Sequence, residues 1–571
     1  MTAILGINCF KHDAAAALLI DGVLVGATEE ERFSRRKHDA GYPEEAINYL
    51  LEQADLKPSD IDHVAYYMRP DQVRKETIRA LPGYLSRKGS IKFFLGQLSG
   101  SVKMGSIPGR MQEHLGDSFS PEFHFIDHHE CHAWSAWFGA GCRNAAVLTM
   151  DGAGEKHSCL VGSITGGVLT EYRRTHLPVS PGLFYSAVTR YLGFTPDNDE
   201  YKVMGLSSYG KPVYLDLFRR IISAEDGRFL IDSKLLDVSM GVHHAVFSPE
   251  VLSILGEPRD PGDGEPTERH ENIAASAQRA IEEAGLAVVK YLRKQTDHDL
   301  LVIAGGVALN CVMNGLFERE GGFQEIYPFP APNDAGTSVG AAVAVHRIVS
   351  PDTLLQKLET MYLGSGFSTD EILTDIEMAK LSPLQPENLA ETVAEMISHG
   401  LVVAVYQGRT EFGPRALGNR SILADPRRAE MKDIVNGVVK HREGFRPFAP
   451  ACIQEDAGKY FLGCVKSSHM IKTYPVVEGM ASVIPAVTHV DNTARVQTVT
   501  REENAFYYDI IKEFGKITGV SVVLNTSFNI RGEPIVNTPI DAVRCYYGTG
   551  IDALVMPPFL FVKKPAHGEK S

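Results

Sequence analysis

The sequence lacks the features that mark secreted and membrane proteins. Its eight cysteines are scattered along 571 residues without any Cys-x-x-Cys pair, so we expect a reduced, cytoplasmic protein. The N-terminus has no basic segment followed by a long apolar core, and we therefore expect no signal peptide. No apolar run approaches the roughly 20 residues that a membrane-spanning helix needs. We predict that the protein makes no membrane contact.

An excess of positive charge is also missing. Asp and Glu number 71 against 57 Lys and Arg, which gives a net charge of −14. A dedicated nucleic-acid-binding protein normally carries a basic face, so we expect no nucleic-acid partner. The Walker sequence Gly-x-x-x-x-Gly-Lys-Ser/Thr is absent too, so any phosphate site must be built differently. The length and the 44% content of hydrophobic residues predict two or more domains with substantial cores.

A short stretch, Asp-His-His-Glu-Cys-His, has the spacing of a metal site. If a helix begins near Asp127, His128 and His132 lie one turn apart on the same face, as two imidazoles must to bind one ion. His129 and Glu130 then point elsewhere. Such a pair of histidines also occurs by chance at a polar helix start, so the interpretation depends on further ligands.

Two similar arrangements of strands and turns indicate a duplicated α/β core with a ligand cleft between its halves. In each, an apolar strand leads through a polar turn into a hairpin, a plan typical of actin- and sugar-kinase-like folds. The expected strands are 3–8, 14–20 and 23–27 in the first half, and 145–150, 158–164 and 168–173 in the second.

Two carboxylates follow strands or open helices beside the expected cleft. Asp151 begins the turn Asp-Gly-Ala-Gly-Glu, and Asp334 lies where the small-residue helix 335–348 begins. Together with His128 and His132 they form a mixed N and O donor set, which suits Fe²⁺, Mn²⁺ or Zn²⁺ better than Ca²⁺. A plain helix cap is an equally good interpretation of Asp334 alone.

A glycine pair, Gly305-Gly306, ends the buried strand predicted at 300–304. Glycines at that point let the backbone approach a ligand closely. The helix expected next would turn its N-terminal amides toward a nucleotide. The long helix predicted at 266–295 has a regular apolar spacing, and we interpret it as structural.

The C-terminal part carries cations in loops. After a linker near residue 352, the glycine-rich segment 408–421 contains three arginines. Arginine forks bind phosphate bidentately, and glycine amides can join them. The position of these cations in loops favours a polyanion site over scattered surface arginines. The candidate residues are Arg415, Arg420, Lys440, Arg446 and Arg495, with Asn525 and Ser527 as uncharged donors.

The motifs together resemble a known family. His-x-x-x-His from 128, Asp-Gly-x-Gly-Glu from 151, Gly-Gly-Val-Ala-Leu-Asn from 305 and Asn-Asp-x-Gly from 333 resemble the tRNA threonylcarbamoyl-transferase fold. The pair His12-Asp13 and the segments Tyr-Lys-Val-Met-Gly-Leu, Gly-Pro-Arg-Ala-Leu-Gly-Asn-Arg-Ser and Leu-Asn-Thr-Ser-Phe-Asn are closer to the NodU/CmcH O-carbamoyltransferases, which include antibiotic carbamoyltransferases. The resemblance covers nearly the whole chain.

This resemblance implies a fold and an activity. A duplicated actin/sugar-kinase-like (ASKHA) domain, residues 1–352, would be joined to a YrdC-like α/β domain, residues 353–571. The C-terminal domain would make carbamoyl-adenylate and pyrophosphate from carbamoyl phosphate and ATP, with Mg²⁺. The N-terminal domain, with Fe²⁺ as the expected metal, would transfer the carbamoyl group to a hydroxyl and release AMP. The chain would be an ATP-dependent O-carbamoyltransferase.

The resemblance also implies roles for individual residues. His12 would position or deprotonate the acceptor, although a turn histidine bonded to Asp13 is an equally good interpretation. The implied sets are His128, His132, Asp151 and Asp334 for the metal; Gly152, Lys202, Gly305, Gly306 and Asn310 for the carbamoyl-adenylate; Arg415, Arg420, Lys440, Arg446, Arg495, Asn525 and Ser527 for carbamoyl phosphate and ATP; and His12, Lys440 and Arg446 for catalysis.

Two other functions stay open. A tRNA-modifying threonylcarbamoyl-transferase is disfavoured by the second domain and the acidic charge. A non-catalytic nucleotide- or metal-binding subunit would be expected to have broken motifs. The acceptor would be a small molecule such as a sugar, an aminoglycoside or a polyketide, and the protein a monomer or homodimer. Segments 69–110 and 212–265 are predicted to build the acceptor pocket, although a helical cover over the sheet better suits 78–110.

Overall fold

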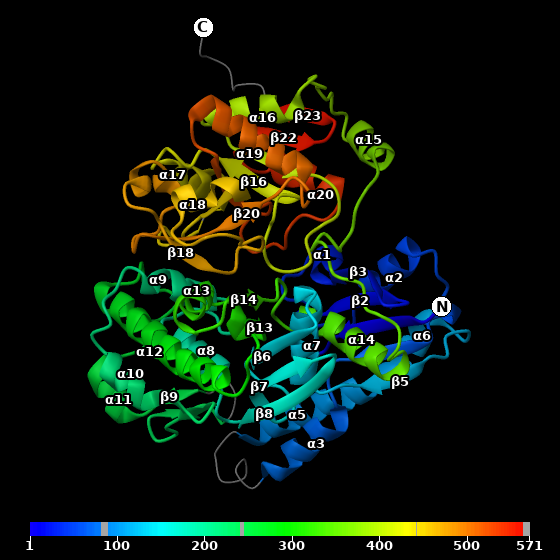
Figure 1. Ribbon diagram of the computed structural model, residues 1–571, viewed down its shortest axis with the longest axis vertical. Coiled ribbons are helices and arrows are strands. Elements are labelled where there is room, and N and C mark those ends of the chain that lie inside the picture. Colours follow the sequence, from blue (N-terminus) through cyan, green and yellow to red (C-terminus); the bar gives the residue numbers. More distant parts are fainter. Residues whose placement is uncertain (82–89, 240–244, 441, 564–571) are drawn as a thin grey trace. The chain divides into compact units, whose positions relative to one another are not determined.

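The computed structural model describes residues 1–81, 90–239, 245–440 and 442–563 (Figure 1). The chain forms two compact units. Unit 1 comprises Met1–Ser34 and His38–Leu358, and unit 2 comprises Arg35–Lys37 and Glu359–Ser571. The main division therefore falls a few residues after the predicted boundary at 352.

Unit 1 is built on two five-stranded sheets of the same topology. Their orders are β3-β2-β1-β4-β5 and β8-β7-β6-β13-β14. In each, a central strand pairs antiparallel with a hairpin on one side and parallel with the next strand on the other. The strands are β1 (Ala3–Asn8), β2 (Ala15–Ile20), β3 (Val23–Glu29), β4 (His63–Tyr66), β5 (Glu122–Phe125), β6 (Asn144–Met150), β7 (His157–Thr165), β8 (Val168–His176), β13 (Leu300–Ala304) and β14 (Glu325–Pro328).

The predicted duplication is thus present strand for strand. The residues at the hairpin turns explain why the sequence could predict it. The hairpin between β2 and β3 turns at Asp21 and Gly22, where φ is +47° and +81°. A two-residue turn of this kind needs positive φ at both positions, which Asp-Gly supplies at little cost. Short apolar runs bounded by such turns can be recognised without knowledge of the fold.

Two helices, α7 (His128–Ala140) and α14 (Ala335–Val349), pack against each other beside the sheets (Figure 1). Their contact is close because glycine lies at the crossing. A Cβ atom on Gly340 of α14 would lie 1.7 Å from the carbonyl oxygen of Cys131 in α7. A Cβ on Gly6 of β1 would lie 2.0 Å from the carbonyl oxygen of Ser338 in α14. These approaches fix the N-terminal ends of both helices relative to the sheets.

The remaining elements of unit 1 surround this centre. The segment predicted as a helical cover contains helices α3, α5 and α6, while its residues 82–89 lie outside the described part of the chain, as do 240–244. The helices are α1 (Glu31–Ser34), α2 (Glu44–Gln53), α3 (Pro70–Arg79), α5 (Ser90–Gly105), α6 (Ile107–Leu115), α8 (Pro181–Tyr191), α9 (Glu200–Ser207), α10 (Leu215–Ile221), α11 (Pro249–Leu255), α12 (Glu268–Arg293) and α13 (Cys311–Glu320), and the short strands are β9 (Ile222–Glu225), β10 (Arg228–Ile231), β11 (Leu236–Asp237) and β12 (Val246–Phe247).

Unit 2 is a seven-stranded mixed sheet with a core on each face, in the order β20-β17-β21-β16-β15-β22-β23. Along β15, Val403 and Val405 join one core with helices α16 and α19, while Ala404 and Tyr406 join the other. The strands are β15 (Val403–Tyr406), β16 (Arg420–Ala424), β17 (Ala449–Ile453), β18 (Thr473–Pro475), β19 (Thr493–Arg495), β20 (Gln497–Val499), β21 (Val522–Ser527), β22 (Ala553–Met556) and β23 (Phe559–Val562), and the helices are α15 (Thr369–Met378), α16 (Leu389–Ser398), α17 (Met431–Val435), α18 (Ala457–Tyr460), α19 (Ala505–Thr518) and α20 (Pro539–Tyr547).

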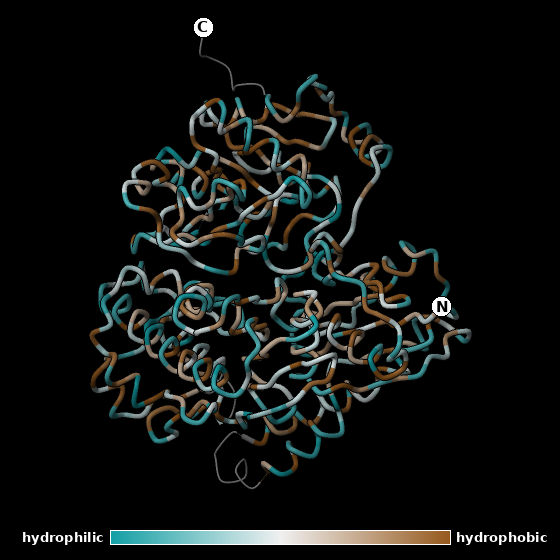
Figure 2. The backbone as a smooth tube through the Cα atoms, in the orientation of Figure 1, coloured by the Kyte–Doolittle hydropathy of each residue, from teal (hydrophilic) through white to brown (hydrophobic). Residues whose placement is uncertain are grey.

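The structure is a mixed α/β protein, as predicted. Hydrophilic and hydrophobic stretches are interspersed along the chain in both units (Figure 2). Among the described residues, no helix is long and apolar enough to cross a membrane.

Candidate active site

The helix α7 begins where the sequence predicted and carries the predicted histidine pair. Its N-cap is Asp127, whose carboxylate accepts hydrogen bonds from the backbone N–H groups of His129 (3.1 Å) and Glu130 (3.3 Å). The rings of His128 and His132 lie one turn apart, with centroids 4.6 Å from each other, and both are fully buried. The cap therefore sets the start of the helix so that two imidazoles share one face.

Asp151 and Asp334 complete a cluster around these histidines. Nε2 of His128 lies 3.1 Å from Oδ2 of Asp151 and 3.7 Å from Oδ1 of Asp334. Nε2 of His132 lies 3.7 Å from the same Asp334 oxygen. One donor atom from each of the four residues can be chosen so that all lie within 4.8 Å of one another. Although Asp334 stands at the N-cap position of α14, its side chain makes no capping hydrogen bond.

The donors in this cluster fit a transition-metal ion. Neither ring nitrogen of His132 has a hydrogen-bond partner among the described residues, although the side chain is fully buried. A buried imidazole without partners is costly, and a metal ion would satisfy it. Burial alone would lower the pKa of His128, but the carboxylates of Asp334 and Asp151 outweigh it and raise that pKa to about 9. The site therefore attracts positive charge.

The neighbouring residues of the motif serve other purposes. His129 pairs through Nδ1 with the hydroxyl of Thr149 (2.7 Å) and through Nε2 with the carbonyl of His157 (3.0 Å). Glu130 lies 3.7 Å from Arg174, which also binds the Asp127 cap at 2.9 Å. These contacts agree with the expectation that His129 and Glu130 are not ligands.

The turn that follows β6, residues 151–155, places its backbone next to the cluster of two histidines and two aspartates. Oδ1 of Asp151 accepts the backbone N–H of Gly306 at 2.8 Å, which joins the two predicted loops. Glu155, at the end of the same turn, accepts the backbone N–H of His128 at 3.2 Å. Gly154 passes so close that a Cβ there would lie 3.2 Å from the ring of His128. Glu155 belongs to the Asp-Gly-Ala-Gly-Glu motif, but the sequence pattern indicates no role for it.

A second polar cluster contains His12. Asp13 accepts hydrogen bonds from Nδ1 of His12 (2.8 Å), Nδ1 of His38 (2.7 Å) and the side-chain amide of Asn333 (2.6 Å). Because Nε2 of His12 faces the carbonyl oxygen of Asp197 at 2.8 Å, both ring nitrogens face acceptors. Burial would lower the pKa of His12, but the charge of Asp13 outweighs it and raises that pKa to about 10. Two ring nitrogens facing acceptors and a raised pKa both favour the imidazolium form of His12.

This cluster bears on both interpretations of His12. The predicted bond to Asp13 exists, and the same carboxylate accepts a hydrogen bond from Asn333, the residue before Asp334. An imidazolium holds a proton to donate and has no lone pair with which to accept one. The geometry therefore favours positioning over deprotonation of an acceptor.

The predicted nucleotide glycines differ in how strictly the fold requires them. Gly305 has φ of +92°, and a Cβ there would lie 2.1 Å from the carbonyl oxygen of Met150. Gly152 has no such neighbour: nothing described lies within 4 Å of the Cβ it would carry. Gly305 is thus needed by the fold itself, whereas the open side of Gly152 leaves room for a ligand.

Asn310 and Lys202 are engaged within the protein. Oδ1 of Asn310 caps α13 by accepting the N–H of Met313 at 3.1 Å, and its amide exchanges two hydrogen bonds, each 3.0 Å, with Gln278 of α12. Nζ of Lys202 lies 3.0 Å from Oδ2 of Asp199. The oxygen of the Asn310 amide accepts two of these bonds and its nitrogen donates one, and its predicted contact with the adenylate stays a prediction.

In unit 2, a buried carboxylate shapes the glycine-rich loop. Oε1 of Glu411 accepts the backbone N–H groups of Leu417 (2.8 Å), Asn419 (2.9 Å) and Arg420 (3.2 Å). Gly418 must be glycine because its φ is +117° and a Cβ would lie 2.3 Å from the ring of Tyr507. Glu411 was not singled out from the sequence, although it lies inside the motif.

Arg420 is directed inward. It is fully buried, and its guanidinium donates to the carbonyl oxygens of Gln407 (2.5 Å), Asn419 (3.0 Å) and Gly408 (3.1 Å) and lies 3.7 Å above the ring of Tyr406. These bonds hold the loop in shape, and the predicted phosphate contact of this arginine stays a prediction.

Lys440 is a buried cation of unit 2. Its ammonium is buried and donates to the carbonyl and hydroxyl oxygens of Ser527 and to the carbonyl (2.9 Å) and side-chain oxygen (2.7 Å) of Asn529. Among the described residues no carboxylate lies within ion-pair distance. Burial, followed by the charges of Arg442 and Arg446, holds the pKa of Lys440 well below its usual range. An anion bound here would relieve this destabilisation.

The other predicted residues of unit 2 lie on strands β19 and β21 and in the loops between elements. Asn525 of β21 donates to the carbonyl of Ala416 (3.1 Å) and to the side chain of Gln497 (2.8 Å), which itself donates to Leu417. Strand β21 thereby holds the glycine-rich loop. Arg415 lies in this loop, Arg446 precedes β17 and is bonded to Glu443, and Arg495 ends β19.

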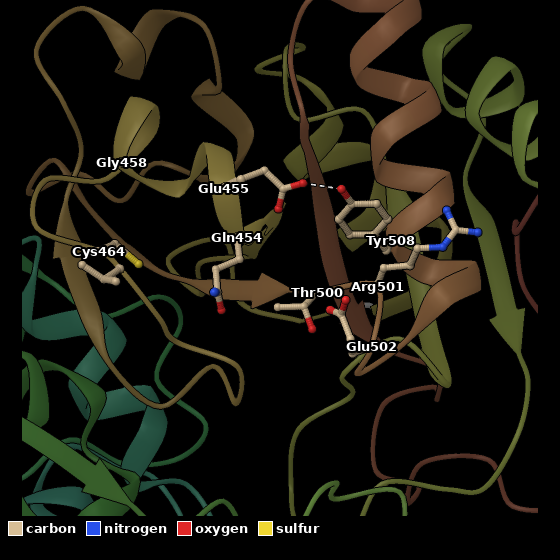
Figure 3. A pocket seen from close by; sticks show the side chains of 9 residues that line it. Gln454, Glu455, Gly458, Cys464, Thr500, Arg501, Glu502 and Tyr508 are labelled. Carbon is tan, nitrogen blue, oxygen red and sulfur yellow. Dashed lines mark hydrogen bonds between the residues drawn. The ribbon is translucent and has the colours of Figure 1, made fainter.

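A pocket of about 570 Å³ lies elsewhere in unit 2 (Figure 3). It is lined by Gln454, Glu455, Gly458, Cys464, Val465, Thr500, Arg501, Glu502 and Tyr508, and it is open to solvent. The hydroxyl of Tyr508 donates to Glu455 across it (Figure 3). Its lining includes none of the predicted site residues, so the chemistry indicated by the sequence does not belong to this pocket.

Comparison with protein families identifies the chain. The family described as Carbamoyltransferase N-terminus matches residues 3–343, and Carbamoyltransferase C-terminus matches residues 394–563. The chain belongs to the carbamoyltransferase family. The predicted NodU/CmcH relationship is confirmed by relatives of that type.

Three relatives show the range of this carbamoyltransferase family. The nodulation protein NolNO of Sinorhizobium fredii is 37% identical over 98% of this chain and 80% of its own length. The 3'-hydroxymethylcephem-O-carbamoyltransferase of Amycolatopsis lactamdurans is 38% identical over 45% of this chain and 47% of its own. An uncharacterised protein of Synechocystis, sll1178, is 38% identical over 99% and 97%, respectively.

Proposed function

We propose that this carbamoyltransferase moves a carbamoyl group from carbamoyl phosphate to a hydroxyl of a small molecule, with ATP as co-substrate. The observation that carries the proposal is the buried cluster of two imidazoles and two carboxylates in unit 1. It supports an active enzyme over a non-catalytic subunit, because every donor that the sequence predicted is retained at close distance. A relative named as a cephem O-carbamoyltransferase supports a hydroxyl acceptor.

Unit 2 would make the activated carbamoyl group. Water would cleave carbamoyl phosphate to carbamate and phosphate. A carbamate oxygen would then attack the α-phosphorus of ATP, bound as its Mg²⁺ complex, so that the bond to the leaving pyrophosphate breaks and carbamoyl-adenylate forms. Lys440 is suited to this chemistry because its ammonium has neutral oxygen partners, and an anionic ligand would provide the opposite charge. The loop shaped by Glu411 would present Arg415 and backbone amides.

Unit 1 would perform the transfer. The acceptor oxygen would attack the carbamoyl carbon, the bond to the AMP oxygen would break, and the hydroxyl proton would pass to solvent or AMP. His128, His132, Asp151 and Asp334 would hold Fe²⁺ or a similar ion. When bound, such an ion supplies a Lewis acid toward the carbonyl oxygen. Because no neighbouring atom among the described residues occupies the space beside Gly152, the adenylate would fit there, close to Asp151.

His12 would act as a positioning residue with a fixed positive charge. Asp13 keeps its Nδ1 proton in place, and Nε2–H, now directed at the carbonyl of Asp197, is the proton available to a ligand oxygen. A donor of this kind stabilises negative charge that develops on a carbonyl or phosphate oxygen. His38 and Asn333 share the same carboxylate and would keep it oriented.

A direct assay tests the proposal. Purified protein with Fe²⁺, Mg²⁺, ATP, carbamoyl phosphate and a panel of hydroxylated acceptors is expected to release AMP and pyrophosphate and to add a carbamoyl group to one acceptor, both followed by mass spectrometry. His132→Ala should abolish transfer but leave pyrophosphate release from ATP. Production of ADP and orthophosphate from ATP would show that the adenylate route is wrong. Transfer to tRNA in place of a small molecule would favour the threonylcarbamoyl-transferase alternative.

A further inference from the structure

Two histidines and a glutamate meet at the edge of the first sheet. Strands β4 and β5 pair in parallel, with His63 opposite Glu122 and Ala65 opposite His124. Because side chains alternate along a strand, His63, Glu122 and His124 project from the same face. Strand β5 is the outer strand of this sheet. The register therefore gathers three potential ligands on one surface, none of which belongs to the sites described above.

The distances among these groups match those between ligands of one ion. Nδ1 of His63 lies 3.1 Å from Nε2 of His124, and Oε2 of Glu122 lies 3.6 Å from the first nitrogen and 3.8 Å from the second. Two ligands held at about 2.05 Å from a tetrahedral zinc ion are about 3.3 Å apart. All three separations lie within about 0.5 Å of that value, so small side-chain rotations would bring each atom into position.

The hydrogen bonds in the cluster leave ligand atoms available. The two facing nitrogens can share one proton, and the carboxylate oxygen is too distant from both for a hydrogen bond. Both histidine side chains are largely buried, with exposed fractions of 16% and 14%, whereas that of Glu122 is 68% exposed.

We propose that His63, Glu122 and His124 bind a zinc-class divalent cation at the edge of the first sheet, with water completing its coordination. Two imidazoles and one carboxylate favour Zn²⁺ over Mg²⁺ or Ca²⁺, which select oxygen ligands. The ion would fasten β5 to β4. Since β5 leads directly into Asp127 and helix α7, this clamp would stabilise the strand that precedes the predicted catalytic metal site.

The surroundings indicate an exchangeable ion. Among the described residues, neither His63 nor His124 donates its other ring nitrogen to a carboxylate or carbonyl. Such outer partners typically raise metal affinity by about 10–100-fold. We therefore expect a site that loads and empties with the zinc concentration, in contrast to the fully buried cluster of His128 and His132. The proposal is independent of the proposed transfer reaction.

Counting bound zinc tests the site. The full-length protein is stripped of metal, and Zn²⁺ is titrated in competition with a chromogenic chelator. His63→Gln and His124→Gln should each bind one equivalent less than the wild type. His298→Gln, which changes a surface histidine bonded to Thr165 at 2.8 Å, should bind the same number as the wild type. His132→Ala should retain the equivalent that depends on His63. If His63→Gln binds as much zinc as the wild type, the proposal is wrong.

Chemical protection gives a second, residue-specific measurement that does not depend on any variant. Diethyl pyrocarbonate carbethoxylates accessible neutral imidazoles, and peptide mass spectrometry locates the modified residues. Zn²⁺ should slow the modification of His63 and His124 together at least tenfold while leaving His298 unchanged. Equal modification rates with and without Zn²⁺ would overturn the site, whatever the binding stoichiometry shows.

Discussion

Replacing Lys440 with methionine should separate ligand binding from stability. In the unliganded protein the ammonium is buried near two arginines, and burying such an ion costs several kcal/mol. The substitution removes that cost but also removes a donor. In the variant, the carbonyl oxygen of Ser527 would still accept a hydrogen bond from the backbone N–H of Asn529 (3.1 Å). Oδ1 of Asn529 would still accept one from the hydroxyl of Ser527 (2.7 Å). Only the carbonyl of Asn529 loses its partner, at about 1–3 kcal/mol if water cannot reach it.

These opposing terms nearly cancel, so unliganded Lys440→Met should differ from the wild type by less than about 2 kcal/mol. The response to ligand should differ far more. Pyrophosphate or carbamoyl phosphate at 100 times its Kd stabilises the protein that binds it by about 2.7 kcal/mol. For a unit of this size that corresponds to roughly 5–11 °C in Tm. We expect this shift in the wild type and none in Lys440→Met.

Differential scanning fluorimetry with increasing ligand measures both quantities, and Lys459→Met is a matched control because that lysine is exposed and paired with Asp456. The pH dependence gives an independent check. Because the folded-state pKa of Lys440 is lowered, the unfolded chain binds an extra proton, and stability should rise with pH toward the ordinary value of 10.5. Lys440→Met should lose that rise. A full ligand shift in Lys440→Met, or an unliganded Tm lower by more than about 10 °C, would refute the reasoning.

Three further predictions concern unit 1. Asp13→Asn should return the pKa of His12 from about 10 toward its usual 6.5, as followed by NMR titration. In the wild type the contact between His12 and Asp13 stabilises the fold fully below pH 6.5, and this stabilisation is lost as the pH approaches 10. An unchanged pH dependence of stability in the variant would contradict the assignment. Gly305→Ala should prevent soluble expression or cost several kcal/mol in denaturant unfolding, whereas Gly152→Ala should fold normally; similar stabilities would be inconsistent with the strain at Gly305. Asp334→Asn should lower Fe²⁺ binding, measured by dialysis and metal analysis, because it removes one of the four donors, and it should lower the pKa of His128 from about 9; Fe²⁺ binding equal to that of the wild type would contradict the place of Asp334 in the cluster.

The sequence was most informative where one residue pattern has one physical meaning. Apolar runs ended by Asp-Gly or Gly-Gly turns predicted both hairpins of unit 1, because these turns need the left-handed conformation. The i,i+4 spacing of His128 and His132 predicted a shared face on a helix, and α7 has it. In both cases the deciding interaction is local, so neighbouring residues in the sequence contain the information.

Long-range hydrogen bonds are the part of the site that the sequence could not show. The amide of Asn310 is bonded to Gln278, on a helix that the apolar spacing indicated as structural. Strand pairing turns the side chain of Arg420 toward backbone carbonyl groups. Neither partner can be inferred from sequence spacing, because the fold creates the contact.

The two candidate sites favour ligands of opposite charge, and in both a buried carboxylate orients the backbone. The unit 1 cluster attracts a cation, and Lys440 in unit 2 lacks a described counter-charge, so each site is expected to be less stable without its ligand. In each unit a buried carboxylate accepts backbone N–H groups and holds the loop: Glu155 at the start of α7 and Glu411 in the glycine-rich segment. Side chains that touch a ligand must complement its charge and its hydrogen-bonding groups, which makes them recognisable in a sequence. A carboxylate that only orients backbone has no such signature, and substituting Glu155 or Glu411 should therefore impair its site although neither was predicted to bind anything.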